Sequence, residues 1–201
     1  MALVSQKVVV ANGTLMVDQG DNSATRIAVA DNDPTRATYA CFVPGFVPVA
    51  STTDFLQIIG SASRIIRVRS IVITGAATAA SNILITTVRR STASTGTTTN
   101  IPLISRDTGD NAAAATVQTF TANPTLGTLI GSADGGRLNI APAATGTLDR
   151  LALQYSWLND KAPVLRGATD CLCLNLNGAA WPAGGVLDIN VVLSEDLNAS
   201  N

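Results

Sequence analysis

The segment LALQYSW, residues 151–157, alternates large apolar residues with small or polar ones. Successive side chains of a β-strand point to opposite faces, so the large residues would share one face: Leu151, Leu153, Tyr155 and Trp157. The same period of two recurs in CLCLNLN (171–177) and VLDINVVLSE (186–195). This pattern predicts three antiparallel strands, each with one face against a core.

About ten segments carry strand signals, separated by turns rich in glycine, proline and asparagine. They are residues 39–49, 54–60, 64–74, 82–90, 115–121, 126–130, 137–141, 148–157, 170–177 and 186–195. The first, with Pro44 and Pro48, suits an edge or bent strand. Many short strands without intervening helices predict an all-β fold, and we expect an antiparallel β-sandwich of the jelly-roll type. An up-and-down barrel is the alternative.

The composition of the chain excludes several classes of function and partner. With one glutamate and two lysines in 201 residues, the chain lacks the residues that usually cover helices. It has no histidine, which excludes histidine-dependent catalytic triads, metal sites and proton shuttles. A net charge of −1 provides no general attraction for nucleic acid or anionic lipid. No apolar run reaches the roughly 18 residues of a membrane span, so neither nucleic acid nor membrane is an expected partner.

Aspartates are the main acids left for catalysis, and most lie in turns, where their short side chains stabilise the backbone. We therefore predict that the protein is not an enzyme and needs no cofactor. Residues 18–22 and 107–111 faintly suggest calcium loops, but they lack the spaced ligands and closing glutamate of an EF-hand, so no metal is expected. The glycine-rich residues 131–136 do not follow a strand and open a helix, so they do not suit phosphate binding and are predicted to be turns.

Cys41, Cys171 and Cys173 form no ligand quartet and are predicted to be small buried residues. A bridge between Cys171 and Cys173 is not expected, because they lie two residues apart on one strand. Trp157 is expected in the core, whereas Trp181, just before Pro182, is expected at the surface or in an interface.

Residues 1–35 differ from the rest of the chain in their sequence pattern. Asn12-Gly13 separates two apolar runs and suits a two-residue turn, which predicts an N-terminal β-hairpin. Its apolar residues are candidate interface residues: Val8, Val9, Val10, Leu15, Met16 and Val17. The following residues, up to Pro34, cannot form a core and read as an arm or linker. The expected organisation is an arm with a hairpin (1–35) and a jelly-roll domain (36–201), without a signal peptide.

A hairpin between residues 64–74 and 82–90 would place Arg67 opposite Arg89, with Arg69 and Arg90 close by. Such a cluster needs anions, either on another subunit or protein or as intramolecular partners such as Asp54 or Asp170; solvated arginines are a further alternative. Residues 91–111 form one long irregular stretch, and loops of about 20 residues are usually functional or disordered. The remaining candidate interface residues are Arg67, Arg69, Arg89, Arg90, Thr98 and Trp181.

Four stretches carry a resemblance to a known class of proteins. They are YACFVPGFVPVASTTDFLQIIGSASRIIRVRSIVI (39–73), VRRSTASTGTT (88–98), FTANPTLGTLIGS (120–132) and VLRGATDCLCLNLNGA (164–179). The chain resembles the β-sandwich proteins encoded among the virion structural genes of tailed bacteriophages, over roughly residues 36–196. These motifs are packing and turn elements without a catalytic signature, so no functional residue is carried over.

The resemblance implies a structural protein of the phage particle, with capsid decoration or cementing as the leading role, often as a homotrimer. The implied partners are further copies of the chain and the major capsid protein, and the implied location is the virion, after synthesis in the bacterial cytoplasm. Charged residues make up 13% of the chain, against about 25% in average proteins. The surface is therefore expected to be covered either by serine and threonine or by other subunits, and the second option fits a coat component. The alternative is a tail-tip or fibre module that recognises a host surface receptor.

Overall fold

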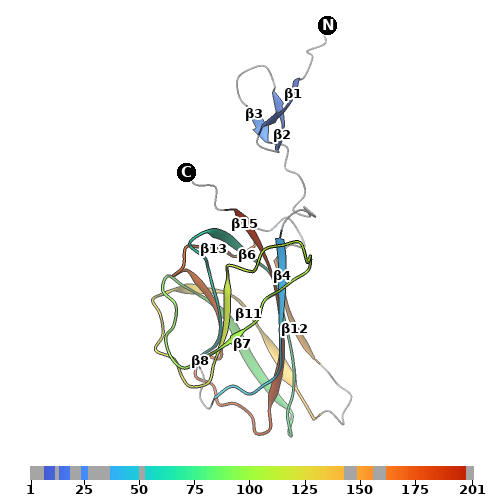
Figure 1. Ribbon diagram of the computed structural model, residues 1–201. Helices are drawn as coiled ribbons and strands as arrows, with labels where there is room; N and C mark the ends of the chain where they lie inside the picture. Colours follow the sequence, from blue (N-terminus) through green and yellow to red (C-terminus); the bar gives the residue numbers. More distant parts are fainter. Residues whose placement is uncertain are drawn as a thin grey trace. The chain divides into compact units, whose positions relative to one another are not determined.

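The structure is a computed structural model that describes residues 7–11, 14–18, 24–26, 37–49, 53–142, 149–155 and 162–197. The chain divides into two compact units, Met1–Thr35 and Arg36–Asn201. The predicted Asn12-Gly13 turn and Trp157 lie outside the described residues. Figure 1 shows strands and no helices in the described parts of both units.

The first unit contains a small antiparallel sheet. Strands β1 (Lys7–Ala11) and β2 (Thr14–Asp18) pair from Ala11 with Thr14 to Lys7 with Asp18, as expected for the predicted hairpin. Strand β3 (Ala24–Arg26) adds to the free edge of β2. The sequence did not predict β3, because its three residues are flanked by the aspartates, asparagines and glycines typical of linkers.

The second unit contains two sheets. Sheet I has the order β12 (Arg150–Gln154), β6 (Arg64–Ala76), β15 (Val186–Leu197), β4 (Ala37–Phe46) and β9 (Ile104–Ser105), and β13 (Val164–Arg166) also pairs with β6. Sheet II has the order β11 (Leu129–Ile140), β7 (Ser81–Arg90), β14 (Cys171–Asn175), β5 (Asp54–Ile59), β10 (Thr116–Phe120) and β8 (Thr98–Ile101). All the pairings are antiparallel.

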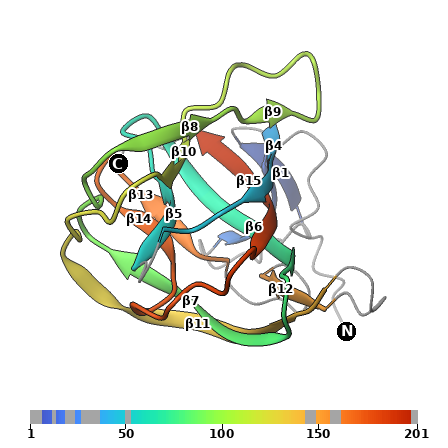
Figure 2. The same cartoon turned by 90° about the horizontal axis from the view of Figure 1, so that it is seen from below.

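The strand pairing follows the jelly-roll pattern. Eight strands pair from the two ends of the unit inwards: β4 with β15, β5 with β14, β6 with β12 and β7 with β11. Strands β8, β9, β10 and β13 are additions to this pattern. Successive pairs alternate between the sheets, as in a chain folded back on itself and wound into a roll. Figure 2 shows the two sheets facing each other, with β11 and β12 at one side and β8 and β9 at the other.

The core lies between the sheets. On β15, Leu187, Ile189, Val191 and Leu193 are fully buried and alternate with less buried neighbours along most of the strand, as the period of two predicted. Burying a side chain of this size contributes about 1.5–3 kcal/mol. Strand β14 differs from its prediction, because all five of its residues are buried and both of its faces are therefore covered.

The predicted hairpin between residues 64–74 and 82–90 is wrong. Strands β6 and β7 belong to different sheets, so the segment between them crosses from sheet I to sheet II and does not form a tight hairpin. Arg67 is paired in register with Val164 and Ser194, whereas Arg89 is paired with Leu172 and Gly131. A period of two identifies strands but not whether neighbours in sequence are neighbours in a sheet.

Residues 131–136 are not turns but lie within β11. This strand includes residues 137–140 of the predicted strand 137–141 but only residues 129 and 130 of the predicted strand 126–130. The glycines permit close approach: a Cβ on Gly135 would lie 2.8 Å from the carbonyl oxygen of Ile85, and one on Gly136 would lie 2.6 Å from Leu151 Cδ1. Two register shifts bend the strand here. The expected irregular stretch 91–111 likewise contains β8 and β9, which extend the two sheets.

Candidate interaction surface

The four candidate arginines bind partners within the chain. Arg67 forms an ion pair with Asp196, with Nε 2.8 Å from the carboxylate, and Arg69 Nε donates to the Ser194 hydroxyl at 2.8 Å. Both lie on the outer side of sheet I. Arg89 forms an ion pair with Asp170 at 2.6 Å and also donates to the carbonyl of Val164.

Arg90 is buried with Asp54 on sheet II. Its Nε and Nη2 donate to the two carboxylate oxygens of Asp54, at 2.7 and 3.0 Å, and its Nη1 donates to the carbonyl of Gly127. The Ser94 hydroxyl and the Asn175 amide also donate to Asp54, at 2.7 and 2.6 Å. Two of the intramolecular partners proposed from the sequence, Asp54 and Asp170, therefore hold Arg90 and Arg89.

These hydrogen bonds set the charge of Asp54. Burial by itself would raise the pKa of this carboxyl, but the donors on Arg90, Ser94 and Asn175 outweigh burial and hold the pKa below its usual value. The pair is inaccessible to a partner, since the two side chains are 5% and 0% exposed. Through Ser94 and Gly127, the Asp54–Arg90 pair holds the segments that contain these two residues against sheet II, and this contact stabilises the fold.

The three cysteines are free thiols and are buried, as predicted. Cys171 and Cys173 lie with Val88 in a small apolar cluster separate from the main core. Burial raises the pKa of Cys41 to about 11, so this thiol is poorly suited to act as a nucleophile. The hydrogen bond between Cys171 and Cys173, and then burial, raises the pKa of Cys173.

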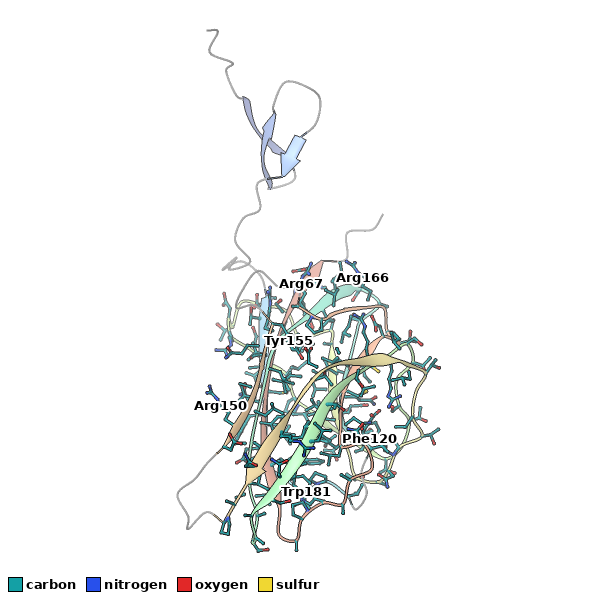
Figure 3. The ribbon with its side chains drawn as sticks, turned by 180° about the vertical axis from the view of Figure 1, so that it is seen from behind. Arg67, Phe120, Arg150, Tyr155, Arg166 and Trp181 are labelled. Carbon is teal, nitrogen blue, oxygen red and sulfur yellow. The ribbon has the colours of Figure 1, made fainter. Side chains whose placement is uncertain are left out.

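The remaining candidate residues do not form one site. Trp181 is half-buried, packs against the core and donates from Nε1 to the carbonyl of Gly185 at 2.8 Å. It lies at the opposite end of the sandwich from Arg67 (Figure 3). Thr98 begins the edge strand β8, paired with Phe120. The apolar candidates of the hairpin lie on β1 and β2, in the other unit.

Two register rows on the outer face of sheet I contain no charged residue. The first row crosses five strands through Ile104, Ala40, Val192, Ser70 and Gln154. The second crosses four strands through Phe42, Asn190, Val72 and Ala152. All nine residues are half-buried or exposed, and we call them the neutral rows.

Phe42 and Ile104 are the large apolar residues most exposed in the neutral rows, at 58% and 63%. They are close neighbours, because Ile104 pairs with Ala40, two residues before Phe42 on the same face. Neither residue was predicted from the sequence to lie in an interface. The available signal was Phe42 itself, a large apolar residue out of step with Tyr39, Cys41 and Val43; Ile104 lay in a segment expected to be a loop.

Other exposed apolar residues lie elsewhere on the second unit. Leu126, Leu129 and Ile130 lie at or just before the start of β11, with exposures of 44%, 61% and 60%. Within the described residues no group of three or more acids or cysteines could hold a metal ion, and no helix could span a membrane. The 107–111 segment is closed by its own hydrogen bonds, such as that from the Gly109 amide to Asp107.

Comparison with known proteins gives no match: no family model, no curated protein and no solved structure is similar to this chain.

Proposed function

We propose that this protein is a structural component of a phage particle that binds and stabilises the capsid as a decoration or cement protein. In this role the sandwich is the folding unit, further copies of the chain are partners, and the N-terminal hairpin contacts a neighbouring copy or the major capsid protein. No catalytic step is part of the role.

The observation that carries the proposal is the pair of neutral rows on the outer face of sheet I. A rigid jelly roll presents two rows of uncharged residues there, with Phe42 and Ile104 exposed. Exposed apolar residues grouped on one face are typical of protein–protein contacts. Arg67 and Arg69, beside these rows, are held by Asp196 and Ser194 of the same chain, so the rows themselves offer an uncharged and partly apolar area for contact with another protein.

The alternative role in receptor recognition is less well supported. Surfaces that bind sugars or host proteins are commonly rich in aromatic residues. Of the aromatic side chains that the structure describes, Phe42 alone is exposed, whereas Tyr39, Phe55 and Phe120 are buried and Phe46, Tyr155 and Trp181 are half-buried. Decoration therefore accounts better for this surface.

Deleting residues 1–35 tests the role of the first unit. The core of the sandwich consists of residues from the second unit, so the shortened chain is expected to fold with a similar unfolding temperature. We expect it to lose co-sedimentation with expanded capsid shells, while the full chain binds them. Full binding by the shortened chain would contradict the role of the arm, and no binding by either protein would contradict decoration.

A further inference from the structure

We infer that a second copy of this chain binds the neutral rows of sheet I, so that two copies stack sheet against sheet. The inference deepens the homo-oligomer part of the proposed function and rests on it. It assigns the contact to a particular face, which the sequence analysis did not include among the candidate residues.

Charge favours a second copy as the occupant. A face that meets its own copy must not place like charges together, and the neutral rows contain none. The next row contains Asp188 and Arg150, on either side of Thr74, so its formal charges cancel. Beyond the opposite side of the rows, Arg67 is paired with Asp196, Arg69 donates to the Ser194 hydroxyl, and Arg106 is exposed beside Thr38. This margin is basic and lies outside the neutral rows.

The shape of the face also suits stacking. Three residues of the neutral rows have small side chains, Ala40, Ser70 and Ala152, and two more are valines, so a second sheet could approach to the roughly 10 Å that separates packed sheets. Phe42 and Ile104 stand out at the β4–β9 side as the large apolar residues that could anchor the contact.

The available area reaches the size of a specific contact. Strands β4, β15 and β6 overlap over residues 187–195 of β15, β12 adds five residues and β9 adds two. With strands about 4.8 Å apart and about 3.3 Å per residue, the whole outer face of sheet I measures roughly 500 Å². Two copies would therefore bury roughly 1,000 Å², close to the lower limit for a specific interface. A contact between identical faces is two-fold and closes at two copies, whereas a trimer would require two different surfaces to meet.

Sedimentation velocity of the full chain over a range of micromolar concentrations tests this contact. We expect the wild-type protein to reach twice its mass of 20.6 kDa. Phe42→Asp places a carboxylate in each half of the stack and should weaken association at least tenfold, and Ile104→Asp should do the same. Leu129→Asp is the matched control, because Leu129 is 61% exposed but lies on β11 of sheet II; it should associate like the wild type.

Circular dichroism melting of each variant establishes that it is folded. The inference is overturned if the wild-type chain remains a single copy, if it forms a trimer, or if Phe42→Asp and Ile104→Asp associate as well as Leu129→Asp. These measurements contain no capsid shells, so failure of the stacked contact remains distinct from failure of shell binding.

Discussion

At the residue scale, the buried pair of Asp54 and Arg90 is the main polar determinant of stability. In Asp54→Asn the guanidinium would remain buried without its counter-charge, and breaking a buried pair in this way costs about 3–5 kcal/mol. Urea unfolding should show this loss. Asp134→Asn is the control, since that carboxylate is exposed and should change stability by less than about 0.5 kcal/mol. Equal effects of the two changes would contradict the assigned role of Asp54.

The lowered pKa of Asp54 predicts that the free energy of unfolding decreases at acid pH. The pKa of Asp54 is lower in the folded state than its ordinary value of 3.8, so its ionisation stabilises the fold above that pH. This contribution is lost as the pH falls from 3.8 through the lowered folded-state pKa. Unfolding free energies measured from neutral pH downwards should therefore converge for the wild type and Asp54→Asn. A constant difference across the acid range would exclude this linkage.

A substitution of Tyr155 is expected to change stability in the opposite direction from Asp54→Asn. Its hydroxyl is buried with no hydrogen-bond partner among the described residues, and burial, followed by the charge of Asp134, raises its pKa to about 12. Removing an unpaired buried hydroxyl eliminates a desolvation cost, so Tyr155→Phe should leave stability unchanged or raise it by up to about 1 kcal/mol. A thermal melt that shows a clear loss would mean that the hydroxyl has a stabilising partner.

At the element scale, the sequence predicted most strands but not all their connections. The alternation in residues 186–195 fixed which side chains of β15 enter the core, because one face of a half-buried strand must be apolar. The partners of β6 could not be deduced in the same way, since many registers bury the same alternating residues. The arginine contacts depended on that pairing, and so Arg67 and Arg89 were wrongly placed opposite each other.

The glycines near β11 provide a test of packing between elements. A Cβ at Gly127 would lie 1.9 Å from the carbonyl oxygen of Thr92, whereas one at Gly131 has no atom within 4 Å. Gly127→Ala should therefore displace the segment that covers sheet II and cost at least about 2 kcal/mol, while Gly131→Ala should cost less than about 0.5 kcal/mol. Hydrogen exchange at the Ser94 and Gly127 amides should accelerate in Gly127→Ala alone; slow exchange in both variants would argue against this packing.

At the scale of the whole molecule, a jelly roll accounts for how a chain with so few charges can be ordered, and it leaves an uncharged surface for the protein contacts that we propose. Its ionic groups are largely engaged within the second unit, and its uncharged residues include a face broad enough to bind another protein. The low number of charged residues was evident from the composition of the sequence. The sequence could not locate the face, because Phe42 and Ile104 become neighbours only when β9 pairs with β4.

Immunogold electron microscopy of intact phage particles, with antibodies against this protein, tests the central claim most directly. A decoration protein should be labelled over the whole surface of the head, at many sites on each particle. Label confined to one end of the tail would contradict capsid decoration and support receptor recognition, and particles without label would contradict a structural role in the virion.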